Sequence, residues 1–74
     1  MKDVPPYAIA IYWSKEDSAF VAEVPELLGC AADGQTYDEA LEAARRAISM
    51  WIEVTREMGK PVPEPLGREA VVAA

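Results

Sequence analysis

Histidine is absent from the 74 residues, and cysteine occurs once, as Cys30. Without histidine, the chain lacks the commonest general base and metal ligand, and it has no Ser-His or Cys-His nucleophile pair. A single cysteine also excludes an internal disulfide, so the fold must rest on packing. These absences favour a cytoplasmic protein, and we expect neither a cofactor nor a bound metal ion.

Basic residues are scarce too: seven Lys and Arg stand against thirteen Asp and Glu, for a formal net charge of −6. Proteins that bind nucleic acid carry an excess of Lys and Arg, so direct nucleic-acid binding is not expected. The charge suits a basic partner protein, although acidity also keeps a small domain soluble. The longest apolar run, residues 7–13, is far shorter than the roughly 18 residues of a membrane-spanning helix.

Two apolar segments predict a β-hairpin. Residues 7–13 (YAIAIYW) and residues 20–24 (FVAEV) read as strands joined by a short polar turn. Alternation places Ile9, Ile11 and Trp13 on one face of the first strand and its other apolar residues on the opposite face.

A long helix is predicted over about residues 37–58. Thr36 and Glu39 form a capping box at its start, while Gly59 and Pro61 end it. Beyond it, residues 70–74 (AVVAA) form either a fourth strand or a frayed end. The apolar positions at helical spacing are Tyr37, Leu41, Ala44, Ile48, Trp51 or Ile52, and Thr55.

The glycine-containing stretch before the helix has three alternative interpretations: a phosphate loop, a reactive thiol or a tight turn. Gly29 and Gly34 are separated by CAAD, where no basic residue is available and the Asp33 carboxylate would repel phosphate. Cys30 has no electropositive neighbour to favour a thiolate. We therefore predict a short third strand at residues 29–32 followed by a turn.

The carboxylate side chains are the remaining candidates for catalytic groups. A metal-dependent nuclease needs several of them converging on one cation. Glu23 is the only acid inside a predicted strand, and its neighbours Phe20, Ala22 and Val24 face the other way. A solvated acidic face is the favoured interpretation, and a minimal metal-dependent nuclease is the weaker one.

The first predicted strand is apolar on both faces, whereas a single helix covers only one face of a small sheet. An uncovered apolar strand is an aggregation hazard. A second copy of the chain or a different protein must cover it. We therefore predict an interaction module that self-associates through its sheet, as a dimer or tetramer.

The segment FVAEVPELLGCAADGQTYDEALEAARRAI, with YAIAIYW before it and GKPVPEP after it, resembles the N-terminal module of HicB-type antitoxins. The resemblance covers residues 7–65. The residues that carry it are Phe20, residues 24–27, Gly29, Cys30, Gly34, Thr36, Glu39, Ala40 and Leu41.

This resemblance implies an α+β fold of order β-β-β-α-β. A small antiparallel sheet would carry one long helix on one face, as a partial, non-catalytic ribonuclease H-like fold. Family members typically neutralise a small basic toxin, HicA, a ribonuclease that cleaves messenger RNA, by covering its active surface. Many add a C-terminal DNA-binding domain. Since this chain ends at Ala74, we expect residues 1–74 to form a single HicB-like domain without one.

The first functional hypothesis is therefore a non-enzymatic antitoxin that binds a small basic ribonuclease. The main alternative is an orphan homo-oligomer with a regulatory or ligand-binding role. We predict that contact with the partner falls on the hairpin and its acids. The predicted partner-binding residues are Trp13, Glu16, Asp17, Glu23 and Glu26.

Overall fold

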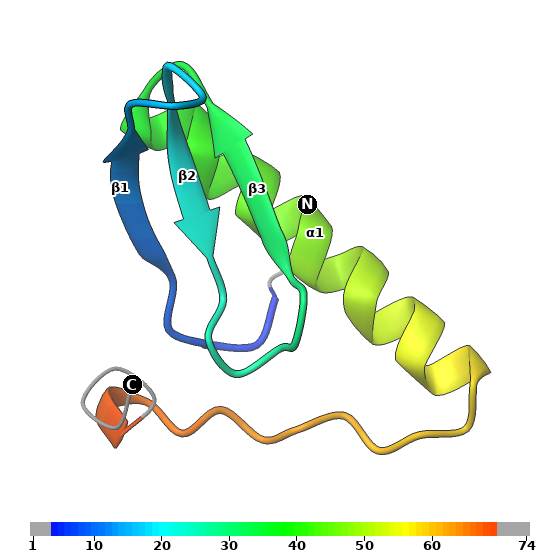
Figure 1. Cartoon of the computed structure of the whole chain (residues 1–74). Helices are drawn as coiled ribbons and strands as arrows, with labels where there is room; N and C mark the ends of the chain where they lie inside the picture. The colour runs from blue at the N-terminus through cyan, green and yellow to red at the C-terminus, as the bar shows by residue number, and fades with distance from the viewer. Residues whose placement is uncertain (1–3, 70–74) are drawn as a thin grey trace.

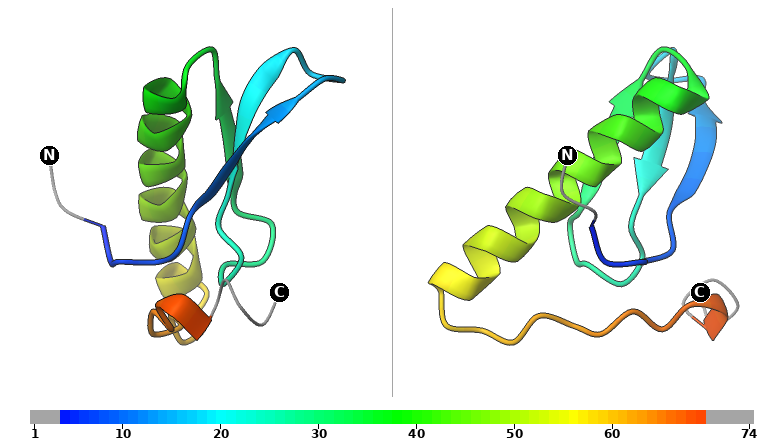
Figure 2. Two further views of the ribbon diagram at one scale, coloured as in Figure 1. Left: turned by 90° about the vertical axis from the view of Figure 1, so that its left-hand side faces the viewer. Right: turned by 180° about the vertical axis from the view of Figure 1, so that it is seen from behind.

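The computed structural model describes residues 4–69, which form three strands followed by one long helix. The strands are β1 (Ala10–Ser14), β2 (Ala19–Glu23) and β3 (Ala31–Gly34), and helix α1 spans Tyr37–Glu57. The sheet is antiparallel throughout, in the order β1-β2-β3. Figure 1 shows the helix crossing behind the sheet, and the left view of Figure 2 shows it on one face only.

These elements confirm the predicted small α+β fold. The predicted final strand, residues 70–74, lies outside the described residues. Three strands and one helix do not by themselves confirm the ribonuclease H-like comparison.

The predicted strand boundaries differ from the observed ones, most of all at the starts of the first and third strands. The first strand begins at Ala10 rather than Tyr7, because the Tyr7 N–H donates to the Pro5 carbonyl and the Ala8 N–H donates to the Glu26 carboxylate instead of to a neighbouring strand. The third strand begins at Ala31 rather than Gly29. Gly29 has a positive φ of 78° and belongs to a closed loop, in which the Cys30 N–H donates to the Leu27 carbonyl at 2.9 Å.

Helix α1 starts and ends with hydrogen-bonded caps. The Glu39 N–H donates to Thr36 Oγ1 at 3.0 Å, as predicted, but the Glu39 carboxylate accepts from the Gln35 N–H rather than from Thr36. At the other end, Gly59 adopts a φ of 73°. The Lys60 N–H reaches back to the Thr55 carbonyl at 3.1 Å, which is the bond of a Schellman cap.

The core lies between the helix and the inner face of the sheet and is continuous with the loop below the sheet. Near the helix start, Ala22 of β2 packs against Ala40 and Ala44, with Ile9 and Ile11 alongside. Toward the helix end the buried side chains are larger, and Leu27 and Ile48 are the largest fully buried ones. The buried helix residues are Ala40, Ala44, Ile48, Ile52 and Thr55. Tyr37, predicted on the buried stripe, is instead exposed.

The small residues at the helix start let α1 approach the sheet closely. A Cβ atom built on Gly34 would lie 2.5 Å from the Ala40 backbone nitrogen and 2.7 Å from the Glu39 carbonyl carbon. Real Cβ contacts are never that short. The end of β3 therefore has room for glycine only.

After the helix, residues 60–66 form an extended strap that runs beneath the sheet toward the β1 side (Figure 1). Val62 packs against the core, and Pro63 accepts the hydrogen bond from Tyr7. The Leu66 N–H donates to a carboxylate oxygen of Glu26 at 2.6 Å. The strap thus joins the start of the chain to the loop between β2 and β3.

Candidate functional site

The sheet face opposite the helix is the first candidate surface. No helix or strand of residues 4–69 covers it (Figure 2, left view). The register aligns Tyr12 with Val21 and Asp33 in one row, and Ala10 with Glu23 and Ala31 in the next. We call this surface the open face, and its residues are Ala10, Tyr12, Val21, Glu23, Ala31 and Asp33.

Tyr12 is the centre of an acidic patch on the open face. Its hydroxyl donates to Glu23 Oε1 at 3.0 Å. This hydrogen bond raises the pKa of Tyr12, and the negative charges of Glu23 and Asp17 add to the effect. An aromatic ring surrounded by carboxylates is suited to a cationic partner, because the ring face and the acids both attract positive charge.

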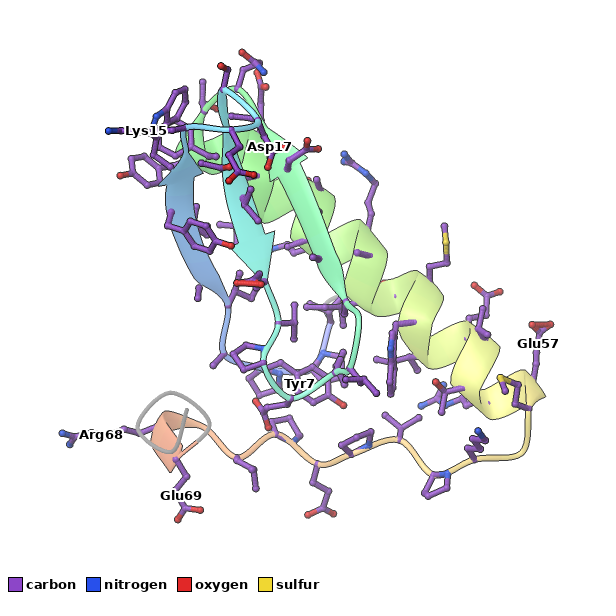
Figure 3. All side chains as sticks on the ribbon, viewed as in Figure 1. Tyr7, Lys15, Asp17, Glu57, Arg68 and Glu69 are labelled. Carbon is purple, nitrogen blue, oxygen red and sulfur yellow. The ribbon has the colours of Figure 1, made fainter. Side chains whose placement is uncertain are left out.

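The turn between β1 and β2 holds two of the predicted acids. The Ser14 hydroxyl donates to Asp17 Oδ2 at 2.9 Å and accepts from the Asp17 N–H at 3.3 Å, while Ser18 adopts a φ of 50°. Glu16 is exposed beside them. Figure 3 shows Asp17 at this turn, with Lys15 on the opposite side of it.

Trp13 lies on the other side of the hairpin from Tyr12, as strand alternation requires. Its ring meets Phe20 edge to face with centroids 5.2 Å apart, and Phe20 in turn contacts Tyr37 at 4.2 Å. Trp13 remains 51 % exposed. The three rings form an aromatic cluster at the hairpin end of the molecule, next to the start of α1.

Glu26 lies away from the other predicted partner-binding residues, in the loop after β2. Its Oε2 accepts from the Ala8 N–H at 3.2 Å and its Oε1 accepts from the Leu66 N–H at 2.6 Å. The carboxylate therefore links two distant backbone segments. The structure thus gathers Glu16, Asp17 and Glu23 around the hairpin, puts Trp13 on its other side, and gives Glu26 an internal bonding role.

Replacing Glu26 with glutamine should test this bonding role. The amide group keeps one oxygen but places an NH₂ against a backbone N–H, so one of the two hydrogen bonds is lost. We expect the free energy of unfolding to fall by about 1–2 kcal/mol in urea titrations. Glu64→Gln, at an exposed carboxylate on the strap, is the matched control, and an equal loss in both variants would refute the role.

Two residues, one on the open face and one in the aromatic cluster, were assigned wrongly from the sequence. Asp33 is a second acid within a strand, so the prediction that Glu23 is the only one is wrong; β3 continues to Gly34, under the helix. Tyr37 joins the aromatic cluster instead of the core. Alternation from the buried Cys30 would have placed Asp33 on the open face.

The remaining chemical groups are consistent with an architectural role. Cys30 is buried in the core, and this burial raises the pKa of its thiol, which disfavours the reactive thiolate. Among residues 4–69, no group of three acidic or thiol side chains converges as metal ligands would. The same residues include no helix long and apolar enough to cross a membrane.

Comparisons with known proteins agree on one family. The sequence model described as HicB_like antitoxin of bacterial toxin-antitoxin system matches residues 7–74. UPF0150 protein ssl0259 of Synechocystis sp. is 39% identical over 57 residues, which cover 77% of each chain. UPF0150 protein Ta0767 of Thermoplasma acidophilum is 36% identical over 59 residues, covering 80% of this chain and 86% of the relative. No solved structure matches the chain significantly.

Proposed function

The chain belongs to the HicB-like antitoxin family of bacterial toxin-antitoxin systems, and from this we propose that it neutralises a small basic ribonuclease toxin of the HicA type. The observation that supports this most is the acidic patch around Tyr12 on the open face. A ribonuclease must present positive charge to the phosphates of its RNA substrate. Carboxylates that occupy this positive surface would exclude the RNA.

The residues predicted from the sequence would serve the proposed contact in two ways: four would touch the toxin, and one would hold the contact surface in place. Glu16, Asp17 and Glu23 would meet the cationic surface directly, and Trp13 would supply a partly exposed ring at its margin. Glu26 would act indirectly, because its hydrogen bonds to Ala8 and Leu66 hold the loop and the strap in place. Aromatic residues surrounded by polar ones are typical centres of protein interfaces.

In this proposal the chain is a binding protein without catalytic activity of its own. It would act in the cytoplasm, where its toxin meets messenger RNA. It would also self-associate as a dimer or tetramer.

Isolation of the tagged chain from its native cells tests the proposal. We expect a small basic protein to co-purify in stoichiometric amount and to be identified by mass spectrometry. That protein should cleave RNA when alone and stop cleaving when the chain is added. Recovery of no such partner, together with normal growth after deletion of the gene, would contradict the proposal and favour an orphan module.

A further inference from the structure

The middle of the open face is Val21, which is half-buried in the central strand β2. The register places Tyr12 of β1 and Asp33 of β3 directly beside it, one on each neighbouring strand. Glu23 follows two residues later in β2 and therefore points to the same face of the sheet. Polar groups thus border an apolar side chain on three sides.

Asp17 borders the fourth side, toward the turn between β1 and β2. The pKa of Tyr12 is raised by its hydrogen bond to Glu23 and further by the negative charges of Glu23 and Asp17, so the Asp17 carboxylate lies near the phenol. In Figure 3, Lys15 extends away from Asp17, on the other side of the turn. We call these residues the Val21 frame: Val21, Tyr12, Asp17, Glu23 and Asp33.

The aromatic ring of the frame is held in place. Tyr12 lies on β1, and Glu23 lies on β2 opposite Ala10, so the hydrogen bond of 3.0 Å from the phenol to Glu23 runs diagonally between the two strands. The Tyr12 side chain is still 45% exposed. An accessible ring and a carboxylate therefore lie side by side before any partner arrives, which lowers the entropic cost of binding.

Charge decides which kind of partner fits the Val21 frame. The frame contains three carboxylates and no Lys or Arg, so it favours a cationic group. A second copy of the chain would bring Glu23 and Asp33 against like charges, and a nucleic acid would bring phosphates against them. An apolar partner would cover the carboxylates without supplying hydrogen-bond donors, which costs free energy.

The combination of groups distinguishes arginine from lysine. A guanidinium group is planar, so it stacks on an aromatic ring and also donates two parallel hydrogen bonds to a carboxylate. Its aliphatic stem packs on apolar surface. A lysine ammonium is a compact, strongly hydrated charge that does not stack in this way. The frame offers an apolar side chain, a ring and carboxylates together, as an arginine requires.

We infer that the Val21 frame binds an arginine side chain of the partner protein. The aliphatic stem would lie on Val21, the guanidinium plane against the Tyr12 ring, and its N–H groups toward the carboxylates of Glu23 and Asp33. This inference deepens the proposed toxin contact and rests on it for the identity of the partner. It adds Tyr12, Val21 and Asp33 to the contact residues that were predicted from the sequence.

Nuclear magnetic resonance titration of the ¹⁵N-labelled full chain is the test. The probes are two capped pentapeptides that differ only in a central arginine or lysine, so they carry the same charge. We expect the arginine peptide to bind at least about 5-fold more tightly, because only the guanidinium both stacks and donates in pairs. The largest amide shifts should fall on Tyr12, Val21, Glu23 and Asp33.

Variants of the ring make the test specific. Tyr12→Val should weaken the arginine peptide by about 5-fold and leave the lysine peptide unchanged, which removes the preference. Valine suits a strand, so the fold should persist. Tyr12→Phe keeps the ring and should restore most of the preference. Tyr37→Val, at a ring that is 61% exposed outside the frame, is the matched control and should change neither affinity.

Three results would overturn the inference: equal affinity for the two peptides, a preference that survives Tyr12→Val, or largest shifts on the acids of α1. The peptides contain no toxin, so the measurement is independent of the co-purification experiment. An arginine preference without a captured ribonuclease would refute the antitoxin proposal alone. A captured ribonuclease without the preference would refute the arginine site alone.

Discussion

A single methyl group added at Gly34 should cost the domain a large part of its stability. In Gly34→Ala, the new Cβ would lie 2.5 Å from the Ala40 nitrogen, 2.7 Å from the Glu39 carbonyl carbon and 2.8 Å from the Glu39 Cβ. Two of these atoms belong to the helix backbone and cannot rotate away. The first turn of α1 must therefore move off the sheet, and the packing of Ala40 and Ala44 on Ala22 loosens with it.

We expect the free energy of unfolding to fall by about 3 kcal/mol, the upper end of the range for overpacked cores. Small domains have only about 0.05–0.15 kcal/mol of stability per residue, or roughly 4–11 kcal/mol for 74 residues, so the loss would remove about a quarter to four-fifths of the total. Urea titration followed by far-UV circular dichroism measures the loss.

Gly59→Ala is the matched control for this experiment. Gly59 has a φ of 73° but no atom within 4 Å of its added Cβ, so alanine meets only backbone strain there. That strain costs about 1–2 kcal/mol. If the two variants lost the same stability, the close approach of the helix to β3 would not be the cause.

Reversing three acids of the hairpin should have the largest effect on binding. Each reversal changes the charge by two units, so Glu16→Lys, Asp17→Lys and Glu23→Lys together bring the formal net charge from −6 to zero. The proposed toxin is basic, and its association would lose electrostatic attraction at the contact surface itself. We expect the association rate at low salt to fall by about 10–100-fold, and its dependence on salt to weaken.

The matched control carries the same change in net charge at a different place. Glu53→Lys, Glu57→Lys and Glu64→Lys are exposed positions on the second half of α1 and on the strap. Stopped-flow or surface-based kinetics with the co-purified partner should show a much smaller decrease for this set. Equal decreases would mean that overall charge, rather than the hairpin, steers the partner.

The parts of the fold that were predicted correctly depend on neighbours in sequence. Thr36 caps the helix because its hydroxyl reaches an amide only three residues away, and Gly59 ends the helix because its own φ is positive. The turn between β1 and β2 is likewise closed by a contact between Ser14 and Asp17. Such features depend on local geometry, which a single sequence already specifies.

The parts that were missed depend on residues far apart in the chain. The Ala8 N–H donates to Glu26 instead of to a neighbouring strand, so the first strand starts later than predicted, and Glu26 lies apart from the hairpin acids because it accepts from Ala8 and Leu66. No local sequence pattern predicts these long-range hydrogen bonds. Trp51, predicted on the apolar helix stripe, does pack against the core, but no local pattern indicates that its indole N–H also donates to the Leu28 carbonyl.

The strap has a consequence for the order in which the molecule assembles. Its contacts close long stretches of chain: Tyr7 and Pro63 are 56 positions apart, and Glu26 and Leu66 are 40 apart. The contacts within the hairpin and the helix close much shorter loops, and closing a long loop has the larger entropic cost. We therefore expect the strap to dock after the sheet and helix have formed and to detach before them. Amide hydrogen exchange should then show the strap opening while the sheet stays protected.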